Sequence, residues 1–129
     1  MASERFIQQR ENFRLALSRL REALEQNETE FVRDSIIQRF EFTFEMAWKS
    51  MFRYLTDKGE KIAEKAWAVL PAAFEAMLIE DAELWEKIRE YRNDTSHEYL
   101  ERMAIEVAAF VRGDGVRLFN ALLERLSRE

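Results

Sequence analysis

Residues 29–56 read TEFVRDSIIQRFEFTFEMAWKSMFRYLT, and this stretch decides the fold. As a helix it would be about 40 Å long at 1.5 Å per residue. Its apolar side chains return every three or four residues, which is the spacing of one face of an α-helix. The main stripe comprises Phe31, Ile36, Ile37, Phe40, Phe44, Trp48, Met51 and Leu55. The pattern therefore predicts a long helix with one face in the core.

The same stretch has a second apolar side. Phe42, Met46 and Phe52 widen the apolar surface beyond the main stripe. A helix that is apolar on more than one side must bury the second side as well. Two interpretations remain open from the sequence: an interface with another subunit, or a wide stripe that faces the core of the same chain.

The preceding and following segments also predict helices. The first begins after Ser3, a residue type favoured at the N-cap, and has helical spacing of Phe6, Phe13, Leu17, Leu20 and Leu24. Beyond Gly59, which is expected to end the long helix, residues 61–79 are helical in composition but contain Pro71. Because proline inside a helix removes a hydrogen bond, we expect a break at Leu70 and a short helix from Pro71 to Leu78. The residues expected to face inward here are Trp67, Leu70, Phe74 and Leu78.

The last part of the chain completes the prediction of the fold. Asp81 is expected to cap a further helix, and a final helical segment runs from Thr95 to about Arg128 with an interruption at residues 113–115. With only three Gly and one Pro among 129 residues, the chain has little material for the tight turns of a β fold. We therefore predict an all-α, up-and-down helical bundle of four main helices plus short helices, forming a single domain over residues 1–129.

The composition excludes several kinds of site. Without Cys there is no disulfide, thiolate zinc site, iron–sulfur cluster or cysteine nucleophile, and the single His cannot supply a His-rich metal site. The formal net charge of −5 argues against a surface coated with basic residues for non-specific nucleic-acid binding. No apolar run approaches the ~20 residues that span a bilayer, and the N-terminus lacks the apolar centre of a signal peptide. We expect a cytoplasmic protein with no membrane contact, no metal and no cofactor.

Residues 92–99, which read RNDTSHEY, contain the only His and the densest group of reactive side chains. In an unbroken helix Arg92 and His97 would lie about 140° apart, so they converge only if the helix breaks between them. The side chains of residues 93–96 compete with helical hydrogen bonds, and Thr95 followed by Glu98 has the pattern of a capping box. The sequence therefore predicts a new helix that begins at Thr95, with His97 in its first turn.

Such an arrangement would suit phosphoryl chemistry on RNA. A helix N-terminus binds phosphate and favours the neutral imidazole that a general base requires, and Arg92 can fork onto phosphate oxygens. His97 would take the 2′-OH proton or protonate the leaving oxygen, and Arg92 would stabilise the charge of the transition state. The same residues also fit an ordinary interhelical turn, so the spacing alone leaves both interpretations open.

The motif and its surroundings resemble the HEPN-domain family. Residues 92–99 are similar to that family's motif of Arg, four residues, His, any residue and Tyr. Residues 40–49, FEFTFEMAWK, and residues 74–79, FEAMLI, with Trp85, resemble more specifically the nucleotidyltransferase substrate-binding proteins, which are close to the HepT toxins. The sequence departs from the family pattern at Met77, where a Gly is usual, and at Glu98, where the substrate-binding branch often has Thr.

The resemblance implies a helical bundle that forms a homodimer or a higher homo-oligomer, and a small nucleotidyltransferase, encoded beside it, as partner. In HepT-like pairs the bundle is a ribonuclease toxin, and the nucleotidyltransferase is an antitoxin that adenylylates the motif tyrosine, which here is Tyr99. By the same resemblance Arg92 and His97 are expected to be catalytic, and Asn93, Thr95 and Ser96 to position the substrate.

Three hypotheses about function remain open. The first is a metal-independent ribonuclease toxin that acts on RNA through Arg92 and His97. The second is a non-catalytic subunit that binds nucleotide or anion and is adenylylated on Tyr99, and the third is a helical interaction module without a ligand. No metal site is expected at Glu41 and Glu45, because di-iron sites in bundles use Glu-x-x-His pairs. Whether the chain is an enzyme is left open.

Overall fold

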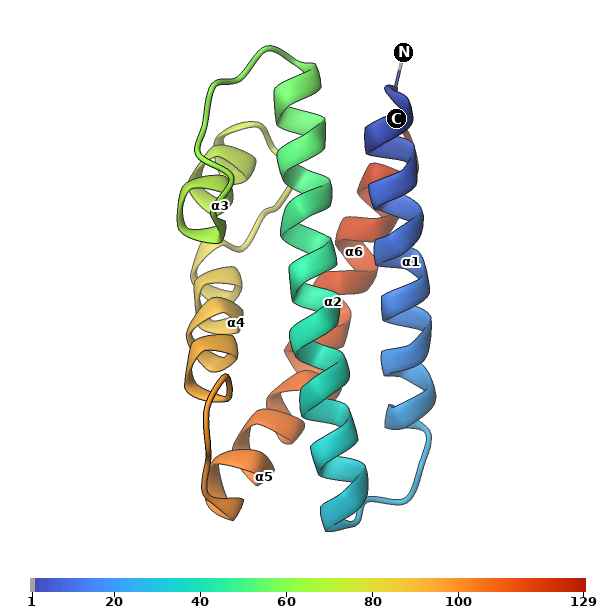
Figure 1. Cartoon of the computed structure of the whole chain (residues 1–129), viewed down its shortest axis with the longest axis vertical. Coiled ribbons are helices and arrows are strands. Elements are labelled where there is room, and N and C mark those ends of the chain that lie inside the picture. Colours follow the sequence, from blue (N-terminus) through green and yellow to red (C-terminus); the bar gives the residue numbers. More distant parts are fainter. Residues whose placement is uncertain (1) are drawn as a thin grey trace.

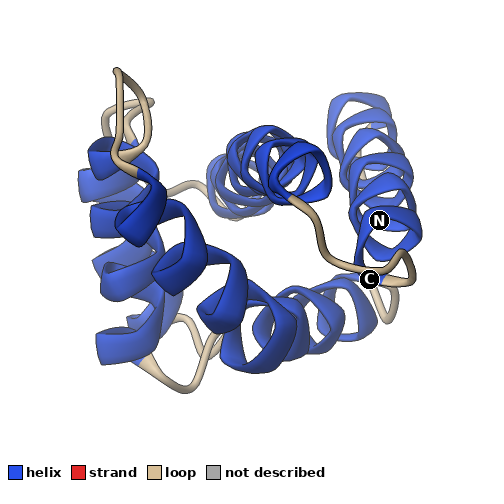
Figure 2. Ribbon diagram, turned by 90° about the horizontal axis from the view of Figure 1, so that it is seen from below, coloured by secondary structure: helices blue, strands red, loops and turns tan. Residues whose placement is uncertain are grey.

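The computed structural model describes residues 2–129, and every regular element in that range is a helix (Figure 2). The elements are α1 (Glu4–Leu24), α2 (Glu30–Asp57), α3 (Ala66–Glu75), α4 (Ala82–Asp94), α5 (Glu101–Phe110), the π-helical turn η1 (Val111–Gly115) and α6 (Val116–Leu126). The predicted all-α helical bundle is therefore confirmed. None of the helices within residues 2–129 is both long enough and apolar enough to cross a membrane.

The long helix α2 is the centre of the fold and contacts each of the other α-helices. Figure 1 shows α1 antiparallel to α2 on one side, with α3 and α4 on the other side. The buried apolar side chains form one cluster, in which the ring of Phe119 packs on Phe13 at 6.2 Å and on Trp85 at 5.7 Å between centroids. The main stripe of α2 thus faces a core to which all helices contribute.

The structure places α2 within one residue of its predicted range. Thr29 is the N-cap, and its hydroxyl accepts a hydrogen bond from the backbone N–H of Val32. At the other end Gly59 has a φ of 91°, a conformation that glycine adopts without a steric penalty. Both ends of the helix therefore depend on local residues that can be read from the sequence.

The second apolar side of α2 is divided between core and surface. Phe52 is buried and Met46 is half-buried, so for these residues the interpretation as a wide core-facing stripe is confirmed. Phe42 is 55% exposed. Phe31 is 85% exposed, and its predicted core position is wrong because it lies in the first turn, at the end of the bundle, where its neighbours do not cover it.

The predicted break at Leu70 is wrong, because α3 continues through Pro71. The carbonyl with which Pro71 would clash is that of Trp67, the second residue of the helix, so only a bond near the exposed N-terminal turn is lost. Leu70 and Leu78 are buried as predicted. Trp67 and Phe74 are 62% and 47% exposed, so the prediction that they face inward is also wrong.

The end of α3 shows why a Gly would be expected at the position of Met77. The N–H of Met77 bonds to the carbonyl of Phe74 at 3.0 Å, and that of Leu78 bonds to Ala73 at 2.9 Å. This pair of bonds requires a left-handed residue between helix and loop, and Met77 has a φ of 62°. Glycine is the residue that fits this conformation best, whereas a side chain strains it.

The C-terminal third contains one confirmed prediction and two corrections. Asp81 caps α4, since its carboxylate accepts a hydrogen bond from the N–H of Leu84 at 3.2 Å. The interruption expected at residues 113–115 is a π-helical turn, through which the chain stays helical from α5 into α6. The helix predicted to begin at Thr95 begins instead at Glu101.

Candidate functional site

The loop between α4 and α5 carries the predicted site residues. At the end of α4 the N–H of Thr95 bonds to the carbonyl of Tyr91 at 3.0 Å, and the Ser96 hydroxyl donates to the carbonyl of Asn93 at 2.8 Å. These bonds satisfy the last carbonyls of the helix. The predicted break between Arg92 and His97 is therefore confirmed, and the hydroxyl of Ser96 is engaged in ending the helix.

The predicted capping box of Thr95 and Glu98 is wrong. Thr95 is buried, and its hydroxyl donates to the Glu41 carboxylate at 2.7 Å instead of capping a helix. The next helix begins at Glu101, so His97 and Glu98 lie in the loop that precedes it. The prediction that His97 lies in the first turn of a helix is therefore wrong. The field of a helix N-terminus falls off within the first turn, and His97 lies outside it.

Glu41 of α2 is a residue of this site that the sequence interpretation missed. Its carboxylate accepts the hydrogen bond from Thr95 and lies 3.9 Å from a guanidinium nitrogen of Arg92. A signal was present, because a carboxylate inside the apolar string of residues 40–48 needs a partner when it is partly buried. Glu41 thus ties the end of α4 to the middle of α2 and holds Arg92 beside α2.

Arg92 also lines a groove of about 620 Å³ between α1, α2 and α4. The other lining residues are Ala16, Arg19, Gln38, Arg39, Glu41, Phe42 and Glu45. Three guanidinium groups in one groove can bind phosphate oxygens, and the exposed ring of Phe42 offers a face for a nucleobase. The carboxylates of Glu41 and Glu45 balance part of that positive charge.

His97 is exposed in the loop between α4 and α5. Within residues 2–129, no hydrogen bond or ion pair engages its imidazole. The structure therefore brings Arg92 to Glu41 and Thr95, and within residues 2–129 no hydrogen bond joins Arg92 to His97. Asn93 is exposed in the last turn of α4.

Tyr99 joins the loop to the first half of α2. Its hydroxyl donates to the carboxylate of Asp34 on α2 at 3.2 Å, and its ring is half-buried. Burial, followed by the negative charge of Asp34, raises the pKa of Tyr99. The phenol is therefore protonated at neutral pH, with a carboxylate already placed to accept its proton.

A second hollow of about 320 Å³ opens next to Tyr99. Its lining residues are Asp94, Glu98, Tyr99, Leu100, Arg102, Met103 and Glu106. With three carboxylates and one guanidinium, this hollow is acidic, unlike the groove at Arg92. The two sides of the loop therefore differ in charge, and an anion is favoured on the Arg92 side.

Comparison with known proteins gives a family model and a solved structure that each cover almost the whole chain. The family model described as nucleotidyltransferase substrate binding protein like matches residues 8–128. The crystal structure of a protein from Thermus thermophilus is similar with a TM-score of 0.78 and 34% identity, over 88% of this chain and 98% of that chain. No curated protein matches. The loop with Arg92, His97 and Tyr99 lies inside the range that the family model matches.

Proposed function

The chain belongs to the family of nucleotidyltransferase substrate-binding-like proteins, and from this premise we propose that it is the partner subunit of a small nucleotidyltransferase. Its loop between α4 and α5 is the target of that enzyme, and Tyr99 is the acceptor of an adenylate. The observation that carries this proposal is the hydrogen bond from the Tyr99 hydroxyl to Asp34.

The transfer needs a nucleophile and a base, and this pair supplies both. The Tyr99 oxygen attacks the α-phosphorus of ATP held by the nucleotidyltransferase, the bond to the bridging oxygen breaks, and pyrophosphate leaves. The phenolic proton passes to the Asp34 carboxylate. A base is required because the raised pKa of Tyr99 keeps its phenol protonated at neutral pH.

The test is adenylylation by a small nucleotidyltransferase, which we expect to be encoded beside this chain. After incubation with that enzyme, ATP and Mg²⁺, peptide mass spectrometry should find adenylate on Tyr99. Tyr99→Phe should abolish the modification, and Asp34→Asn should slow it about 100-fold while leaving the complex intact. Tyr54→Phe is the matched control and should react like wild type. A wild-type chain that binds the enzyme but carries no adenylate on Tyr99 would contradict the proposal.

A second function, metal-independent cleavage of RNA in the manner of the HEPN and HepT toxins, is favoured by different observations. The imidazole of His97 is exposed and free of hydrogen bonds in the described chain, and Arg92 lies with Arg19 and Arg39 in one groove. His97 would remove the 2′-OH proton, the 2′-oxygen would attack the phosphorus, the bond to the 5′-oxygen would break, and the leaving 5′-oxygen would take a proton from water. Arg92 would stabilise the negative charge on the phosphoryl oxygens.

The two functions are separated by an RNA-cleavage assay in EDTA. Wild type should cleave RNA, and His97→Ala and Arg92→Ala should each lower the rate by about 100-fold or more. The exposed Arg102, on α5 nearby, gives a matched control for loss of one positive charge, and Arg102→Ala should retain activity. Equal cleavage by wild type and His97→Ala would exclude the ribonuclease function.

A further inference from the structure

The hydroxyl of Tyr99 and the groove that contains Arg92 lie along the same face of α2. The hydroxyl bonds to Asp34, and the groove is lined by Gln38 and Glu41, which follow Asp34 by four and seven residues. Residues with this spacing share one face of a helix, and here they lie about 6 Å and 10 Å from Asp34 along its axis. The face that holds Tyr99 therefore continues into the groove.

An adenylate on Tyr99 ends the hydrogen bond with Asp34. The phenolic oxygen of the ester carries no hydrogen, so it can no longer donate to the carboxylate. The phosphodiester also adds one negative charge beside the negative charge of Asp34, and like charges repel at this distance. The modified side chain is therefore driven away from Asp34 towards a more positive surface.

The two hollows beside the loop offer this phosphodiester opposite surroundings. The hollow that Tyr99 itself lines has three carboxylates and one guanidinium. The groove along α2 has three guanidiniums and two carboxylates. A phosphodiester is therefore favoured in the groove and disfavoured in the hollow.

Two of the groove's arginines can bind a phosphate without breaking a strong contact. Arg92 reaches the groove from α4 and Arg19 from α1, and Figure 1 shows these helices on opposite sides of α2. The ion pair of Arg92 with Glu41 is long, at 3.9 Å, and the Arg92 side chain is 34% exposed, so such a pair contributes little. Within residues 2–129, no ion pair engages Arg19. Both guanidiniums thus have hydrogen-bond donors to offer.

The groove also has the size and the aromatic surface that a nucleotide requires. Its volume of about 620 Å³ lies within the range of about 300–1,000 Å³ that is usual for small-molecule sites. The half-exposed ring of Phe42 offers a face on which adenine can stack. From Asp34 to Phe42 the helix rises about 12 Å, and a nucleotide extended from its phosphate to its base spans a similar length.

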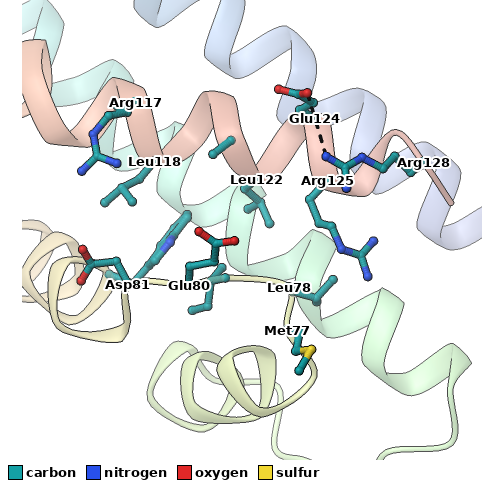
Figure 3. A pocket seen from close by; sticks show the side chains of 13 residues that line it. Met77, Leu78, Glu80, Asp81, Arg117, Leu118, Leu122, Glu124, Arg125 and Arg128 are labelled. Carbon is teal, nitrogen blue, oxygen red and sulfur yellow. Dashed lines mark ion pairs between the residues drawn. The ribbon is translucent and has the colours of Figure 1, made fainter.

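The cavity in Figure 3 suits the adenylate less well. It has a volume of about 370 Å³ and lies between α6 and the segment that connects α3 to α4. It borders the beginning of α4, a helix of 13 residues and about 20 Å, whereas Tyr99 follows the end of that helix. Its three arginines each have a carboxylate partner in the same chain: Arg117 with Asp114, Arg125 with Glu129 and Arg128 with Glu124.

We propose that the groove is the binding site of the adenylate that Tyr99 carries, which rests on the function proposed above. The ligand is a nucleoside monophosphate in ester linkage to the phenol. The Arg92 guanidinium donates hydrogen bonds to the phosphodiester oxygens, and the adenine stacks on Phe42. Because the phosphorus then faces the groove instead of solvent, the groove protects the ester from hydrolysis.

The affinity of the groove can be measured on the unmodified full chain with the methyl ester of AMP. This probe has the single negative charge of the proposed ester and needs no enzyme. A tether supplies an effective concentration in the millimolar range, so a dissociation constant of ~1 mM or tighter is expected in a calorimetric titration. Arg92→Ala and Phe42→Ala should each weaken binding about 10-fold.

Matched controls remove the same groups from other places. Arg102→Ala removes an exposed arginine on the other side of the loop, and Phe74→Ala removes an exposed ring on α3. Both should bind the methyl ester within about 2-fold of wild type. Wild type that does not bind at millimolar concentration, or equal constants in the Arg92, Phe42 and control variants, would overturn the proposal.

A substitution with the opposite expected sign tests the contact between Arg92 and the phosphate. Glu41→Gln removes a negative charge from the groove and frees Arg92, while its amide oxygen can still accept the hydrogen bond from Thr95. It should tighten binding of the methyl ester about 3-fold. Weaker binding by this variant would contradict the contact.

Protection of the ester is tested on the adenylylated chain. A phosphodiesterase that releases 5′-nucleotides should remove the adenylate from Arg92→Ala and Phe42→Ala about 5-fold faster than from wild type, because the bound fraction falls. Arg102→Ala and Phe74→Ala should release it as slowly as wild type. Equal rates from all of these chains would overturn the proposed protection. A chain that binds the methyl ester in the groove but is never adenylylated on Tyr99 would refute the proposed function and retain the groove as a nucleotide site.

Discussion

The left-handed conformation of Met77 predicts that this residue destabilises the fold and that glycine would relieve it. A side chain at a positive φ costs more than a glycine by about 1 kcal/mol, net of the greater freedom of glycine in the unfolded chain. Against this gain, Met77→Gly loses the small buried part of a side chain that is 80% exposed, which costs about 0.5 kcal/mol. The expected result is a stabilisation of about 0.5 kcal/mol.

A comparison with alanine isolates the backbone contribution. Met77→Ala removes the same buried area but keeps the Cβ atom, so it should lower the free energy of unfolding by about 0.5 kcal/mol. The difference between the two variants should then be about 1 kcal/mol in favour of glycine. Gly59→Ala is the reciprocal test: at a φ of 91°, with no other atom within 4 Å of the added Cβ, it should cost about 1 kcal/mol.

The assay is urea unfolding at equilibrium, followed by circular dichroism. Each variant is measured at two protein concentrations, because association would add to the apparent stability. A Met77→Gly chain that is no more stable than Met77→Ala would refute the reasoning from backbone strain. Unchanged stability in Gly59→Ala would refute it as well, because that variant adds a Cβ atom at a positive φ instead of removing one.

Three further predictions concern single contacts. Thr95→Val removes the hydrogen bond to Glu41 and should cost about 1–2 kcal/mol in urea unfolding, whereas Thr95→Ser should retain most of it. Burial, with the hydrogen bond to Glu106, raises the pKa of Tyr91 to about 12. The folded chain thus keeps the Tyr91 hydroxyl protonated above its ordinary pKa of 10.0. The contribution of Tyr91 to stability is therefore complete below pH 10 and is lost between pH 10 and about 12. Unfolding of Tyr91→Phe should depend less on pH in that interval, and an identical profile would contradict the shift. Gly113→Ala adds a methyl group to open space in the π-helical turn and should raise the free energy of thermal unfolding by about 0.5–1 kcal/mol, in contrast to Gly59→Ala.

Local signals in the sequence predicted the helices well and their exposure less well. The spacing of apolar residues in α2 and the cap at Asp81 depend on neighbours within one or two turns, so they can be read from a short window. The apolar spacing of Trp67 and Phe74 was equally regular, yet both are exposed. Periodicity shows which side of a helix is apolar, but the neighbouring elements decide whether anything covers it.

The sequence likewise predicted one part of the candidate site and not the other. The sequence places Arg92, His97 and Tyr99 in one short segment and indicates the break that ends α4. It does not indicate that Thr95 is held by Glu41, 54 residues away, or that Tyr99 is held by Asp34, 65 residues away. Because those contacts formed, Thr95 could not cap a helix, and the next helix begins at Glu101 instead.

The sequence by itself thus determined the helical class, the long central helix and the segment that carries the reactive side chains. These features follow from interactions between residues close together in the chain, where spacing and residue type are sufficient. Only the tertiary structure decided which carboxylates meet Arg92 and Tyr99 and which face of α3 stays uncovered. Those outcomes depend on how α2, α3 and α4 pack, and no short window of sequence contains that information.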